Sequence, residues 1–156
     1  MVSTTMTFEV PGLEDVQKIA QLLAQALTKP LVVFLTGELG VGKTTLVQFL
    51  LRDLGYLKVV KSPTYTFVES YTVHDFMIHH FDLYRISSVE ELEFIGFYDY
   101  VTSDAILLIE WPEQADGYLP ASDLNINWQS NGDRRLHISA GSKAGEQIVE
   151  YLKTHS

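Results

Sequence analysis

The sequence contains no cysteine, which excludes disulfide bonds, thiolate zinc sites and cysteine nucleophiles. Long hydrophobic runs are missing too: apolar runs such as residues 31–35 and 105–109 are far too short to span a bilayer. The first five residues, Met1 to Thr5, show neither the basic region nor the apolar region of a signal peptide. These absences predict a cytoplasmic protein that has no membrane partner.

Positive charge is also scarce, with 11 Lys and Arg against 20 Asp and Glu and a formal net charge of −9. Proteins that bind nucleic acids directly draw much of their affinity from basic side chains on phosphates. We therefore expect no DNA partner, and we expect any RNA to be reached only indirectly, through another protein. The length of 156 residues, without repeats or linkers, predicts a single domain over residues 1–156.

A phosphate-binding loop is the strongest signal in the chain. The pattern G-x-x-x-x-G-K-[ST] is matched by Gly37-Glu38-Leu39-Gly40-Val41-Gly42-Lys43-Thr44. An apolar run of strand length precedes the loop, and a helical pattern over residues 45–54 follows it. This context disfavours an accidental glycine-rich turn. We expect the glycines and the backbone N–H groups as far as Thr45 to surround a polyphosphate. Lys43 would bridge its β- and γ-phosphates, and the Thr44 hydroxyl would bind Mg²⁺.

The remaining periodicity predicts further strands and helices around this loop. Strands are expected at residues 7–10, 31–35, 67–73, 77–82, 105–109, 124–128 and 134–140, and further helices at residues 13–27 and 144–152. We predict an α/β fold: a single-domain P-loop NTPase with a mostly parallel central sheet and helices on both faces. The pair 124–128 and 134–140 is expected as an antiparallel hairpin at the edge of the sheet.

Two carboxylates are expected near the phosphates, because P-loop folds hold Mg²⁺ with an acid at the end of a neighbouring strand. Glu110 follows a continuously apolar run, typical of a buried parallel strand, and Asp82 ends a second predicted strand. If both strands run parallel to the P-loop strand, both carboxylates reach the end of the sheet near Thr44. We predict Glu110 as the Mg²⁺ ligand with Asp82 beside it, and Lys43, Asp82 and Glu110 as the catalytic residues. A capping carboxylate or a partner for Arg85 is the alternative for either acid.

Other classes of site are less well supported. Adjacent histidines, His79 and His80, lie in one predicted strand and point to opposite faces, which disfavours a shared metal ion. The GTPase patterns D-x-x-G and N-K-x-D are missing, so adenine is favoured by default. A small-molecule kinase would show an arginine-rich lid, and none is apparent. No tuned general base is recognisable, which predicts slow hydrolysis. A nucleotide-dependent switch needs the same loop and stays open as an alternative.

Four segments occur in an order that resembles one family. They are Gly37-Glu38-Leu39-Gly40-Val41-Gly42-Lys43-Thr44-Thr45-Leu46, Ser62-Pro63-Thr64-Tyr65-Thr66, His80-Phe81-Asp82-Leu83-Tyr84-Arg85 and Ile109-Glu110-Trp111-Pro112. Together they closely resemble the bacterial TsaE family, formerly called YjeE, over essentially the whole chain. Many families share the first segment, whereas the other three in this order are highly specific.

The resemblance implies a Mg²⁺-dependent P-loop ATPase that binds ATP and ADP. It implies an accessory subunit of the complex that forms N6-threonylcarbamoyladenosine at position 37 of tRNAs reading codons that begin with A. The implied partner is the TsaD–TsaB heterodimer, which would stimulate an ATPase that is slow alone. TsaD would carry out the transfer onto the tRNA, which agrees with the acidic charge of this chain.

The resemblance also implies roles for single residues. By position, Lys43 and Thr44 would serve phosphate and Mg²⁺, Glu110 would be a Mg²⁺ ligand, and Asp82 would be an active-site acid. Thr64 lies in the segment that is similar to the family's switch loop.

Near the base of the nucleotide, the resemblance implies one contact and one departure. Trp111 would lie beside the nucleotide. The family usually has a threonine early in its first helix, near the adenine. This chain has Val16 there, which offers no hydroxyl for that contact but could still pack against the adenine.

Overall fold

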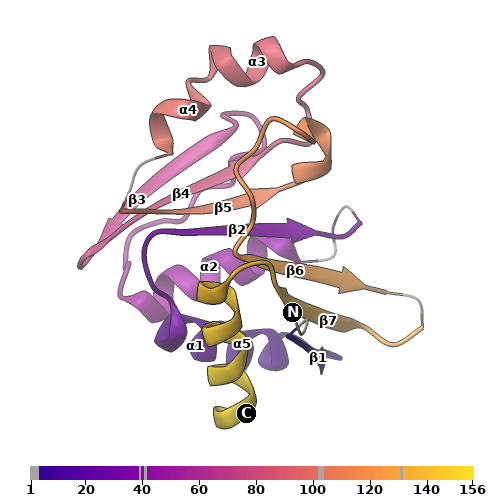
Figure 1. Cartoon of the computed structure of the whole chain (residues 1–156). Helices are drawn as coiled ribbons and strands as arrows, with labels where there is room; N and C mark the ends of the chain where they lie inside the picture. Colours follow the sequence, from indigo (N-terminus) through magenta and orange to yellow (C-terminus); the bar gives the residue numbers. More distant parts are fainter. Residues whose placement is uncertain (1–3, 39, 41, 102–103, 131) are drawn as a thin grey trace.

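The computed structural model describes residues 4–38, 40, 42–101, 104–130 and 132–156. Seven strands form one sheet, in the order β1-β7-β6-β2-β5-β4-β3, with helices packed around it (Figure 1). The strands are β1 Thr5–Glu9, β2 Leu31–Thr36, β3 Val68–Val73, β4 Phe76–Asp82, β5 Ala105–Glu110, β6 Leu124–Gln129 and β7 Arg135–Ala140. The helices are α1 Leu13–Ala26, α2 Lys43–Leu54, α3 Val89–Phe94, α4 Phe97–Tyr100, the 3₁₀ helix η1 Pro112–Ala115 and α5 Lys143–His155.

The centre of the sheet is parallel. Strand β2 pairs in parallel with β5 on one side and β6 on the other, and β4 continues the parallel arrangement beyond β5. Strands β3 and β7 pair antiparallel with their neighbours. The expected α/β fold with a mostly parallel sheet is therefore confirmed. One detail differs: β1 pairs outside β7, so the β6–β7 hairpin lies one strand in from the edge.

One face of the sheet carries the larger core. Helix α1 turns a stripe of apolar side chains toward the strands: Val16, Ile19, Ala20 and Leu23. Helices α2 and α5 pack on the same face, and their buried side chains join one cluster with inward-facing residues of β2, β5, β6 and β7. Ser142 caps α5, because its hydroxyl oxygen accepts a hydrogen bond of 3.2 Å from the Gly145 N–H.

The opposite face is covered over only part of its width. Helices α3 and α4 and the residues around η1 build a second cluster against β4, β5 and β2. In β5 every residue is buried, as its uninterrupted apolar run predicts. We call β2, β5 and β4 the covered half of the sheet. The helices therefore lie on both faces, as expected.

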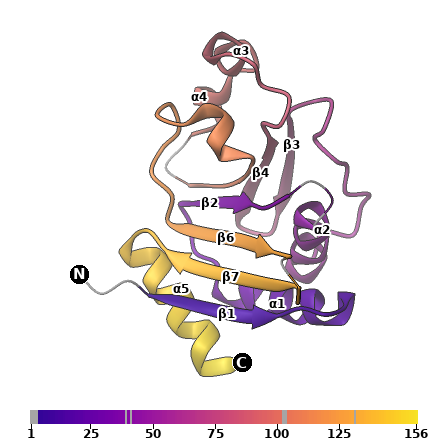
Figure 2. The same cartoon turned by 90° about the vertical axis from the view of Figure 1, so that its right-hand side faces the viewer.

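Strands β6, β7 and β1 form what we call the open half of the sheet. Figure 2 views this half with no helix in front of it. Buried and half-buried residues alternate in β6, and exposed and half-buried residues alternate in β1. This period of two is typical of strands with one face on a core and the other toward solvent. No helix in the described part of the chain is both long and apolar enough to cross a membrane.

Candidate functional site

The glycine-rich loop joins β2 to α2, as its pattern predicts. Gly40 and Gly42 have φ angles of +79° and +111°, in the left-handed region that favours glycine. Gly42 is the N-cap residue of α2, so the helix begins at Lys43 with its free N–H groups turned toward the loop. Leu39 and Val41 were also predicted to contact the nucleotide, but they lie outside the described residues.

Lys43 is buried at the start of α2, with 4% of its surface exposed. Its ammonium donates a hydrogen bond of 2.8 Å to the Gly37 carbonyl and lies 3.8 Å from the centroid of the Trp111 ring. Burial lowers the pKa of Lys43 below its ordinary value, although the Glu110, Glu113 and Asp82 carboxylates favour its charged form. The ammonium is thus held by a neutral carbonyl and a ring face.

Glu110 ends β5 with 3% of its surface exposed and is the acceptor for two side chains. Its Oε2 atom accepts a hydrogen bond of 3.1 Å from the Thr44 hydroxyl. The same oxygen lies 2.5 Å from His80 Nε2. Thr44, His80 and Glu110 lie far apart in the sequence. They meet because β4, β5 and the start of α2 converge at one end of the sheet.

Asp82 lies directly across from Glu110 in the register of β4 and β5. Its Oδ1 atom accepts a hydrogen bond of 3.0 Å from the Tyr84 N–H, and its own N–H donates to the Phe67 carbonyl at 2.9 Å. Burial raises the pKa of Asp82, the Tyr84 N–H lowers it, and the nearby Glu110 carboxylate raises it. The expectation that both acids reach one end of parallel strands agrees with this geometry.

A cavity of about 220 Å³ lies between these groups. Its lining consists of Gly40, Gly42, Lys43, Thr44, Thr45, Thr64, Asp82, Glu110 and Trp111. All nine residues were predicted from the sequence as nucleotide, metal or catalytic residues. Thr64 reaches the cavity from the loop before β3, where its hydroxyl lies 2.7 Å from that of Ser62. The structure therefore brings the switch-like segment to the same cavity as the phosphate-binding loop.

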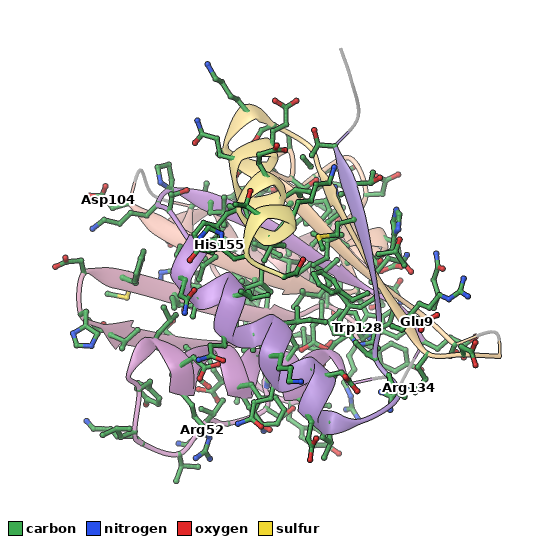
Figure 3. All side chains as sticks on the ribbon, turned by 90° about the horizontal axis from the view of Figure 1, so that it is seen from below. Glu9, Arg52, Asp104, Trp128, Arg134 and His155 are labelled. Atoms are coloured by element: carbon green, nitrogen blue, oxygen red, sulfur yellow. The ribbon has the colours of Figure 1, made fainter. Side chains whose placement is uncertain are left out.

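Other predicted residues lie beside this cavity or away from it. Gly37 accepts the Lys43 hydrogen bond through its carbonyl. Glu38 lines a neighbouring cavity of about 400 Å³ together with residues from the ends of β6 and β7, among them Trp128. Figure 3 shows Trp128 and Arg134 on the side of the molecule where β1 ends at Glu9.

Val16 occupies the position where the resemblance places a residue near the adenine. It is only 2% exposed and packs in the larger core. The Val16 side chain is therefore turned into the protein, which leaves it little surface to offer an adenine ring.

Comparison with known families identifies the chain. A family model described as "Threonylcarbamoyl adenosine biosynthesis protein TsaE" matches residues 10–137. The chain belongs to the TsaE family.

TsaE relatives from bacteria are similar over most of the chain. The Haemophilus influenzae protein named tRNA threonylcarbamoyladenosine biosynthesis protein TsaE is 44% identical over 135 residues, covering 85% of each chain. The Bacillus subtilis protein of the same name is 33% identical over 145 residues, covering 91% of this chain and 90% of the relative. The crystal structure of Bacillus subtilis YdiB matches with a TM-score of 0.79 and 26% identity, covering 99% of this chain and 98% of the other. The expected TsaE membership is confirmed.

His80 is the residue of this TsaE site that sequence reasoning missed. It was weighed only for a metal site shared with His79, and no role followed from the resemblance. The sequence did contain a signal for His80. Side chains alternate between the two faces of β4, so Ile78, His80 and Asp82 share one face, and two of these three residues are polar. In the described residues no group of three or more His, Asp and Glu is arranged to hold a metal ion by itself.

Proposed function

We propose that this chain is a Mg²⁺-dependent ATPase that serves as an accessory subunit in forming threonylcarbamoyladenosine on tRNA. The observation that carries the proposal is the buried Lys43 ammonium. Its partners are a carbonyl and an aromatic ring, and it forms no ion pair within the described residues. A buried charge without a counterion is unfavourable. A polyphosphate in the adjoining cavity would supply that counterion.

The residues present fit a nucleotide with Mg²⁺. The Thr44 hydroxyl donates its hydrogen to Glu110, so the lone pairs of its oxygen stay available to a cation. Glu110 and Asp82 line the cavity on the same side. Thr44 and Glu110 would hold Mg²⁺, which when bound neutralises charge on the phosphate oxygens. Asp82, fixed by the Tyr84 N–H, is oriented to hold a water molecule near the phosphates.

The proposed partner is the TsaD–TsaB heterodimer. The TsaE relatives are named as proteins of tRNA threonylcarbamoyladenosine biosynthesis. The net charge of −9 disfavours direct binding of tRNA by this chain. We propose that tRNA is reached only through the complex and that partner binding stimulates a slow intrinsic hydrolysis of ATP.

The test compares ATP hydrolysis and tRNA modification by the purified chain with and without the TsaD–TsaB pair. Lys43→Ala should weaken ATP binding by at least about 100-fold in calorimetry, because it removes the charge aimed at the phosphates. Modification should be lost as well. Lys58→Ala, which removes an exposed lysine, is the matched control and should bind ATP as the parent chain does.

Each part of the proposal has an outcome that contradicts it. Undiminished affinity in Lys43→Ala would refute the phosphate-site assignment. Modification by a variant that binds ATP but does not hydrolyse it would favour a nucleotide-dependent switch. If the TsaD–TsaB pair changes neither assay, the partner assignment fails and a small-molecule kinase becomes the better candidate.

A further inference from the structure

His80 is a fully buried polar residue beside the candidate site, with 0% of its surface exposed. Its Nε2 atom lies 2.5 Å from Glu110 Oε2, whereas its Nδ1 atom is buried with no hydrogen-bond partner among the described residues. An ionised carboxylate can only accept hydrogen bonds, so Nε2 is the nitrogen that donates. A neutral imidazole then leaves Nδ1 as the unprotonated atom, and no buried N–H is left unpaired.

Both lone pairs of Glu110 Oε2 are occupied by hydrogen bonds in this arrangement. A carboxylate oxygen has two lone pairs, and Oε2 accepts one hydrogen bond from Thr44 and one from His80. Oε1 receives no hydrogen bond from the residues that the structure describes, and Glu110 lines the cavity. The two donors therefore fix the plane of the carboxylate and leave one oxygen for a cation or its water.

The neighbouring histidine shows that this contact is specific to one face of β4. His79 points to the opposite face, where its Nδ1 atom lies 2.7 Å from the Ser70 hydroxyl. Its ring packs edge-on against Tyr100, with 4.7 Å between the ring centroids. Two adjacent buried histidines thus have separate environments, and only His80 contacts a predicted metal ligand.

We infer that His80 is a positioning residue that orients Glu110 so that Oε1 faces the metal of a bound metal–nucleotide complex. This inference rests on the proposed function. Groups that hydrogen-bond to a metal ligand fix its orientation, and their removal typically costs about 10–100-fold in metal affinity or activity. His80 acts through Glu110 alone, so its loss should leave nucleotide binding without metal largely unchanged.

The experiment uses two amides that replace different nitrogens of the imidazole. In His80→Gln the side-chain amide lies where Nε2 was and can still donate to Glu110, whereas in His80→Asn it lies where Nδ1 was and cannot reach. For the full chain, we would measure ADP affinity in EDTA and the Mn²⁺ affinity of the ADP complex by electron paramagnetic resonance. Mn²⁺ stands in for Mg²⁺ in this measurement.

We expect His80→Asn to weaken Mn²⁺ binding by about 10–100-fold, with ADP affinity in EDTA close to that of the parent chain. His80→Gln should restore most of the Mn²⁺ affinity. The matched control is His79→Asn, which changes the adjacent histidine on the other face and should leave Mn²⁺ affinity unaltered.

The outcomes separate this inference from the proposed function. Equal Mn²⁺ affinity in His80→Asn and His80→Gln would overturn the positioning role while the ATPase proposal stands. Loss of ADP binding in EDTA by both variants, with folding intact by circular dichroism, would also overturn it, because His80 would then act on the nucleotide site itself. A parent chain that binds neither ADP nor Mn²⁺–ADP would overturn both.

Discussion

The covered and open halves of the sheet differ in how deeply their polar side chains are buried. In the open half, polar side chains pair at the exposed surface, as in the ion pair of Glu9 and Arg135 at 3.9 Å and the hydrogen bond of Thr7 and His137 at 2.7 Å. In the covered half, helices lie on both faces, yet four ionisable side chains of β4 and β5 lie buried: His79, His80, Asp82 and Glu110. Lys43 joins them from α2.

Burying ionisable groups in the covered half lowers the stability of the fold at the place where the candidate site lies. Burial disfavours the charged forms of Asp82 and Lys43, as the directions of their pKa shifts record. Such shifts cluster at functional sites, where perturbed groups serve binding or catalysis. We therefore expect polar substitutions in the covered half to have large effects on activity or stability, and similar ones in the open half to have small effects.

The largest effect is expected for Glu110→Ala. The substitution removes the shared acceptor of Thr44 and His80 together with a proposed Mg²⁺ ligand. Single-turnover ATP hydrolysis should fall by about 100-fold or more, whereas ATP affinity in calorimetry should fall far less.

Glu93→Ala is the matched control for this variant. Glu93 is an exposed carboxylate of α3, and its loss should leave hydrolysis almost unchanged. A Glu110→Ala chain that hydrolyses ATP at the full rate would show that Asp82, or neither acid, serves the metal.

A smaller effect is expected for Ser70→Ala. Together with Thr7→Val, this variant compares two hydrogen bonds of equal length in different surroundings. Ser70 lies 2.7 Å from the buried His79, and Thr7 lies 2.7 Å from His137 in the open half. Each pair is directly opposed in an antiparallel ladder. Ser70 is itself exposed, but the His79 ring that it contacts is only 8% exposed, so Ser70→Ala should lower the free energy of unfolding by about 1 kcal/mol.

Thr7→Val removes the corresponding hydroxyl where water can replace it. Its cost should stay within about 0.5 kcal/mol. Urea unfolding of both variants gives the comparison. Equal losses in the two variants would mean that the covering helices do not set the value of these bonds.

Much of the fold was predictable because its signals are local. The alternation in β6, the apolar run of β5 and the helical stripe of α1 each record burial along a single segment. The position of β1 was not predictable, since pairing outside β7 depends on a contact between residues far apart in the chain, such as Phe8 and Leu136.

The candidate site also has a part that the sequence predicts and a part that depends on contacts between distant residues. Motif spacing and strand position predicted Lys43, Thr44, the glycines, Asp82 and Glu110 of the 220 Å³ cavity, whereas Thr64 and Trp111 were expected from the family resemblance. The spacing could not give the hydrogen bond between His80 and Glu110, which depends on the register of two parallel strands. The helical pattern over residues 13–27 did place Val16 on the apolar side of a helix that packs on the sheet, and the structure buries it in the larger core.

A modest effect on stability is expected for Asp82→Asn, and it depends on pH. Burial raises the pKa of Asp82 in the folded chain above its unfolded value of about 3.9. The folded state therefore favours the protonated acid, and its stability falls as the pH rises from that value through the folded pKa. Asn, which is never charged, avoids this loss and still accepts the Tyr84 hydrogen bond.

At pH 7 we expect Asp82→Asn to raise the melting temperature, while ATP hydrolysis falls. The gain should shrink as the pH falls toward and below about 3.9, where the carboxyl becomes protonated in the unfolded chain as well. Asp75→Asn, at the exposed turn between β3 and β4, should change the melting temperature little at either pH. A gain for Asp82→Asn that is independent of pH would come from packing alone, and the contrast between the two halves would then not rest on buried charge.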